Sequence, residues 1–166
     1  MKTAYTFSVL RYVHDPVTAE FVNVGVALYA PDAKYLNALC TSHYQRLSRM
    51  FEPIEGDHFR QITKYVQSQI EAIGQKLASE LPFKNPPRNI EDVLGQVLPA
   101  DDSAIQFSTA GGGLTSDLTK TLHELFMRHV ERYAIRVERP SRDEEDVWKV
   151  FRGPLEKRQV IKHLVA

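Results

Sequence analysis

The 166-residue chain has little cysteine and no excess of charge of either sign. Its single cysteine, Cys40, excludes an intramolecular disulfide and a cysteine-rich metal site, and it is typical of a reducing compartment. The 21 lysines and arginines are balanced by 21 aspartates and glutamates. Because proteins that coat nucleic acid usually carry an excess of basic residues, this balance argues against that role, while a local basic patch stays open.

Long apolar runs are also missing. No run is long enough to span a membrane, and the N-terminal residues lack the apolar core of a signal peptide. We therefore expect a cytoplasmic protein that has no membrane partner.

Strand signals dominate the first part of the chain. The segment Glu20–Tyr29 is the most apolar and the richest in β-branched residues, which predicts a central strand. Residues 5–13 alternate as a strand does, and turn residues follow at 14–16, so the two segments should pair as an antiparallel hairpin. Gly25, inside the second strand, predicts a bulge or a close backbone approach.

Helical periodicity follows. Apolar residues repeat at three- and four-residue steps over 57–81 and 116–133, and Asn89 is placed to cap a short helix over 90–98. The glycine run 111–113 is interpreted as a flexible loop. With a short helix at 43–51 and further strands at 34–40 and 103–108, these elements predict an α+β fold. It is an antiparallel meander sheet of about four strands, with helices packed mainly on one face and a helical C-terminal tail.

The character of the sequence changes near residue 136. We expect an α+β core domain over 1–135, and a linker with a helical tail over 136–166. The tail carries Trp148 and Phe151. Because so small a segment cannot bury two large aromatic side chains by itself, we expect them to dock on the core or on another chain.

The N-terminal motifs resemble those of a known family. They are Leu10-Arg11-Tyr12, Asp15-Pro16 and the run Glu20–Val26. The family consists of short bacterial proteins catalogued as domain of unknown function three thousand and thirty-seven. The resemblance covers about the first four-fifths of the chain and implies no chemistry. It implies a small partner component, because relatives are often encoded beside kinase-like or mobile-element genes, and it suggests a defence or toxin–antitoxin association. Some relatives extend further, so we expect a truncated chain.

The opening hairpin supplies the first candidate site, a polar cluster. Residues at equal distances from a hairpin turn lie opposite each other, which should bring Arg11 near Asn23. Such a cluster suits anion binding or acid–base chemistry, while the structural alternative is turn formation and local ion pairing. The members of this polar cluster are Arg11, His14, Asp15, Glu20 and Asn23.

Arginines supply the second candidate site. Arg128 and Arg132 share a helix face and, with Arg136, could form a stripe that binds phosphate or an acidic partner. The alternative is a solvated face with local ion pairs, because acidic residues dilute the stripe. No metal-ligand spacing is found among the histidines, and Cys40 is expected to be a small buried hydrophobe rather than a nucleophile.

The sequence therefore favours a non-catalytic accessory domain that works by protein–protein interaction, with Trp148 and Phe151 as partner-docking residues. A nucleic-acid-binding or processing protein that uses the arginine stripe is the first alternative. A small enzyme centred on the polar cluster is the second. No cofactor and no metal are expected, and homo-oligomerisation stays open.

Overall fold

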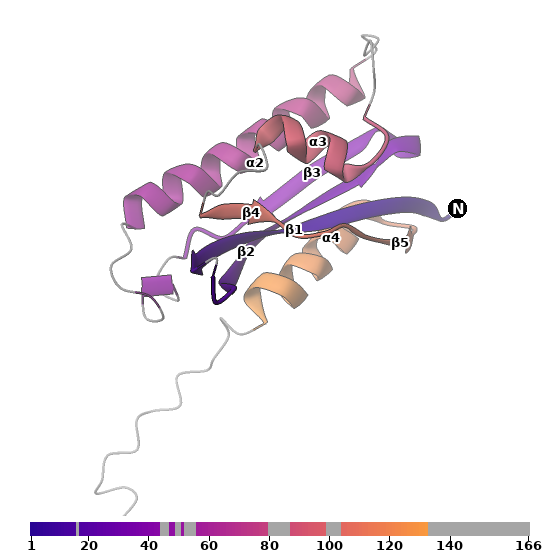
Figure 1. Ribbon diagram of the computed structural model, residues 1–166. Helices are drawn as coiled ribbons and strands as arrows, with labels where there is room; N and C mark the ends of the chain where they lie inside the picture. Colours follow the sequence, from indigo (N-terminus) through magenta and orange to yellow (C-terminus); the bar gives the residue numbers. More distant parts are fainter. Residues whose placement is uncertain are drawn as a thin grey trace, which may run out of the picture. The chain divides into compact units, whose positions relative to one another are not determined.

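A computed structural model shows an antiparallel sheet with helices on both of its faces (Figure 1). The strands run in the order β3-β2-β1-β4, and β5 also pairs with β1. The strands are β1 Thr3–Asp15, β2 Glu20–Ala30, β3 Tyr35–Cys40, β4 Ile105–Phe107 and β5 Gly111–Thr115. The helices are the short η1 Pro31–Ala33, then α2 Gly56–Ala78, α3 Ile90–Val97, α4 Leu118–Phe126 and the π-helix η2 Met127–Glu131. The residues described are 1–15, 17–43, 47–48, 51, 56–79, 87–98 and 104–132.

The core has two layers, one on each face of the sheet. Helices α2 and α3 cover one face, and α4 with η2 covers the other (Figure 1). Leu10, on β1, packs into the first layer, whereas its neighbour Val9 packs into the second. This alternation follows from the two-residue period of a strand, and it explains why the strand segments are apolar on both sides. The predicted α+β class is confirmed, and the helices lie mainly on one face because α2, the longest described helix, packs there together with α3.

A bulge in β2 redirects its side chains. The register pairs Leu10 with Gly25 and then Arg11 with Asn23, so Val24 is an extra residue on β2. A Cβ at Gly25 would lie 2.7 Å from the Sγ of Cys40, which is too close for any real contact. Both parts of the expectation for Gly25, a bulge and a close approach, are thus confirmed.

The glycine run at 111–113 corrects the sequence prediction. It is not a loop but part of β5, and it pairs with residues 5–7 of β1. A Cβ at Gly111 would lie 2.6 Å from the ring of Phe7, and one at Gly113 would lie 2.7 Å from the hydroxyl of Tyr5. Glycine is therefore required because aromatic side chains of β1 lie over the backbone of β5. This contact joins segments far apart in the sequence, so local composition could not reveal it.

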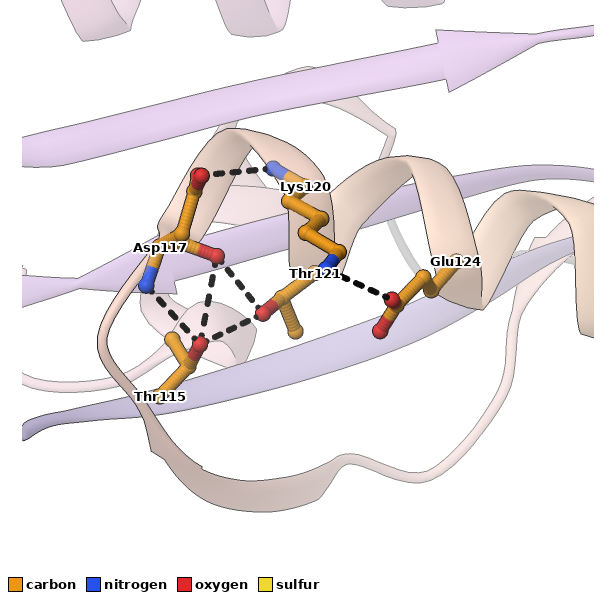
Figure 2. Close-up of polar contacts among 5 residues, drawn as sticks. All are labelled: Thr115, Asp117, Lys120, Thr121 and Glu124. Carbon is orange, nitrogen blue, oxygen red and sulfur yellow. Dashed lines mark hydrogen bonds and ion pairs between the residues drawn. The ribbon is translucent and has the colours of Figure 1, made fainter.

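Local hydrogen bonds fix the helix starts. Asn89 caps α3 as predicted, since its Oδ1 accepts from the backbone nitrogen of Asp92 at 2.9 Å. Asp117 caps α4 in the same way, through the backbone nitrogen of Lys120 at 2.9 Å. Figure 2 shows this turn, where the Oγ1 of Thr115 also accepts from the backbone nitrogen of Asp117 at 3.0 Å. The end of β5 is thereby held at the start of α4.

The predicted helical tail lies outside the described residues, together with Trp148, Phe151 and most of the short helix expected at 43–51. The division into a core domain over 1–135 and a tail over 136–166 stays a prediction.

Candidate functional site

The strongest candidate site lies where the hairpin meets η2. Arg11 and Asn23 are cross-strand partners, as their distances from the turn predicted. The side-chain nitrogen of Asn23 donates to the carbonyl oxygen of His129 at 3.0 Å. This bond ties β2 to η2 and places the pair on the face of the sheet that α4 and η2 cover. We call Arg11, Phe21, Asn23 and His129 the Arg11–Phe21 surface.

Two polar atoms of this surface are buried without a hydrogen-bond partner. They are the Nε of Arg11 and the Oδ1 of Asn23, a donor and an acceptor on neighbouring strands. A buried polar group left unpaired costs about 1–3 kcal/mol, so few are retained in native proteins. Both atoms are shielded from solvent by the surrounding protein, so they raise the free energy of this part of the fold and are not themselves open to a partner.

Phe21 gives the same surface an apolar contact. Its ring lies 4.2 Å below the central carbon of the Arg11 guanidinium, and 43% of the residue is exposed. Stacking of this kind holds the guanidinium in one orientation and leaves an aromatic ring open to solvent. Aromatic and arginine side chains are the residues that most often dominate protein interfaces. The sequence reasoning missed Phe21, although its two-residue spacing from Asn23 on β2 indicated a shared face.

Helix η2 borders the surface with basic residues. The ring of His129 contacts the ring of Phe7, with centroids 5.7 Å apart, and burial together with the Arg128 charge lowers the pKa of His129 below its ordinary value. Arg128, on η2, and Arg132, the residue that follows η2, are both exposed. Arg136, the third residue of the predicted stripe, lies outside the described residues.

The structure divides the predicted polar cluster. The His14 ring stacks on the ring of Phe51 at 4.1 Å, and Phe51 belongs to the layer on the α2 side of the sheet. The Oδ1 of Asp15 accepts from the backbone nitrogens of Val17 and Thr18 at 2.7 and 3.3 Å, and these bonds lower the pKa of Asp15. Asp15 is thus a turn residue, as the structural alternative proposed.

Glu20 is exposed and pairs with Asp15 across the hairpin. The five residues of the cluster therefore do not converge. Only Arg11 and Asn23 are brought together in a way that binding could use.

The next observations concern metal-ligand clusters and the reactivity of the Cys40 thiol in the part of the chain that is described. No group of three metal-ligating side chains occurs there. Burial raises the pKa of the Cys40 thiol to about 12, with a smaller contribution from Glu71. A thiol with so high a pKa is almost entirely protonated at neutral pH and is a poor nucleophile.

The fold is an α+β domain whose antiparallel sheet carries a core layer on each face. The family model described as "Protein of unknown function (DUF3037)" matches residues 7–130, about three quarters of the chain, and the protein belongs to that family. The resemblance drawn from the sequence carries the same family number, but its description is corrected. The matched residues begin at residue 7 rather than at Tyr5. The family's description states only that the function is unknown, and it does not mention the bacterial origin that the resemblance included.

No curated protein and no solved structure matches the chain. Among the described residues, no helix is long and apolar enough to cross a membrane.

Proposed function

We propose that the protein is a non-catalytic accessory domain that binds another protein through the Arg11–Phe21 surface. The observation that carries the proposal is the exposed Phe21 ring beneath the Arg11 guanidinium. A partner side chain with an apolar part and a carboxylate end would cover the exposed Phe21 ring and bring its charge beside the Arg11 guanidinium. Burial of that ring would supply most of the affinity.

The tail contributes a second contact in this proposal. Trp148 and Phe151 are large aromatic residues in a segment too small to bury them alone, so they suit docking on the same partner. The partner we propose is a kinase-like, mobile-element or defence component, in keeping with the resemblance noted from the sequence.

The test is affinity purification of the tagged chain from its own host at moderate salt, with mass spectrometry and nucleic-acid staining. We expect a stoichiometric protein that is lost with Phe21→Ala and weakened by Trp148→Ala. Tyr65→Ala is the matched control, because Tyr65 is an aromatic residue on α2 that is 54% exposed and lies outside the surface. Equal recovery of the protein with Phe21→Ala and with Tyr65→Ala would rule out the Arg11–Phe21 surface as the contact.

Nucleic-acid binding is the second candidate function, favoured by the exposure of Arg128 on η2 and of Arg132, which follows η2. Phosphate contacts release counterions, so this function predicts an affinity for a labelled DNA duplex that falls steeply as salt is raised. Replacing both arginines by alanine should weaken binding and flatten the salt dependence. Arg88→Ala, at another exposed arginine, should leave both unchanged. An affinity for DNA that does not change with salt concentration would exclude contacts between these arginines and phosphate groups.

A further inference from the structure

The outer edge of β5 has no strand partner in the part of the chain that the structure describes. Among the described residues, β5 has one strand neighbour, β1, and the three central residues of β5 are exposed. Leu114 is 66% exposed, which is unusual for a leucine inside a strand. The open edge presents a row of backbone donors and acceptors that another extended chain could pair with.

The opposite edge of the sheet is closed by α2. The Oε1 of Gln67 accepts from the backbone nitrogen of Cys40 at 3.0 Å, and Gly74 packs directly on the carbonyl oxygen of Leu36. Helix α2 thus occupies backbone groups of β3 that would otherwise face outward. The two edges of the sheet therefore differ: among the described residues, a helix contacts the backbone groups of the β3 edge in this way, and none does so at the β5 edge.

The sequence of β5 also lacks the devices that usually block strand addition. Exposed edges are generally protected by lysine, by proline or by inward-pointing charges. The run Gly111–Thr115 contains none of them.

We infer that the outer edge of β5 binds a short extended segment of a partner protein as an additional strand. Leu114 would lie beside a side chain of the added strand, which favours an apolar or β-branched residue there. A strand pair of this length brings together much less surface than the roughly 1,200–2,000 Å² of an interface between folded proteins. The edge therefore suits a peptide segment better than a second copy of the chain. This goes beyond the proposed function, because the Arg11–Phe21 surface involves a different part of β1.

The test uses the full chain labelled with nitrogen-15 and a capped hexapeptide of alternating valine and threonine. We expect chemical-shift changes and slower hydrogen exchange at the amides of residues 111–115. In an added strand, only alternate N–H groups face the sheet. A control peptide that is N-methylated at both the valines and the threonines has no N–H group on either edge and should not bind.

Either of two results would overturn the inference: no change at these amides at millimolar peptide, or binding of the fully methylated peptide as tight as that of the unmethylated one. Concentration-dependent dimerisation that protects the same amides without peptide would overturn the choice of occupant and assign the edge to a second copy.

Two variants locate the effect on the protein. Leu114→Lys should weaken peptide binding about fivefold, the upper end of what one cross-strand side-chain pair contributes. Val17→Lys is the matched control, since Val17 is an exposed aliphatic residue in the hairpin turn. Phe21→Ala should leave peptide binding unchanged, so failure of this inference and failure of the proposed function can be told apart.

Discussion

For the substitution of Gly74 by alanine, helix propensity and tertiary packing change the free energy of unfolding in opposite directions. In the middle of a helix, replacing glycine by alanine normally stabilises a protein by about 1 kcal/mol. Gly74 lies on the buried face of α2, however, and a Cβ there would meet the carbonyl oxygen of Leu36 on β3 closer than any real contact. We therefore expect Gly74→Ala to destabilise the protein.

The size of the destabilisation depends on which atoms must move to make room for the added Cβ. Forcing an extra carbon into a packed core costs about 1–3 kcal/mol. The obstructing atom is backbone, and Leu36 is held in register with Tyr29 of β2, so the cost should lie in the upper half of that range. Subtracting the propensity gain leaves a net loss of about 1–2 kcal/mol, equivalent to a Tm lowered by about 2–8 °C.

Gly95→Ala is the matched control in α3. Gly95 is exposed, and a Cβ there would meet nothing within 4 Å, so this variant should gain about 0.5–1 kcal/mol. Urea unfolding followed by circular dichroism measures both variants against the parent. If Gly74→Ala proves as stable as the parent or more stable, the close packing of α2 on β3 is refuted.

Three further predictions concern a cap, a histidine and a thiol. Asn89→Ala should lower the free energy of unfolding by about 1 kcal/mol in urea titrations, whereas Asn89→Asp should retain the cap. Because the folded chain holds the pKa of His129 below 6.5, the unfolded chain binds its proton first. Stability should therefore fall as pH drops below that value, less so in His129→Gln, and urea midpoints measured across this range would show it. Because the pKa of Cys40 is raised, its thiol should react with iodoacetamide at neutral pH far more slowly in the folded protein than in urea. Mass spectrometry measures the labelled fraction in each state, and equal labelling in both would contradict this prediction.

The sequence predicted features that depend on neighbouring residues. The Asn89 cap requires only the backbone three residues ahead, and the turn at Asp15 requires only the next few residues, so local chemistry identifies both. The hairpin register followed from the turn, and it placed Arg11 beside Asn23 correctly.

Features that depend on distant partners were not predicted. The glycine run at 111–113 has a loop-like composition, yet the rings of Tyr5 and Phe7 make it a strand. The hairpin cluster looked like one site, but the faces of the strands separate His14 from Arg11 and Asn23. Phe21 became a candidate binding residue only when the structure showed its ring stacked on the Arg11 guanidinium.

By itself the sequence determined the α+β class, the hairpin, the bulge at Gly25 and the Asn89 cap of α3, because periodicity and short-range hydrogen bonds are encoded locally. Tertiary structure alone decided which edge of the sheet α2 closes, which edge stays open, and which polar atoms of Arg11 and Asn23 are left unpaired. These properties arise where segments distant in the sequence meet, and their free energies depend on packing geometry that no local pattern records.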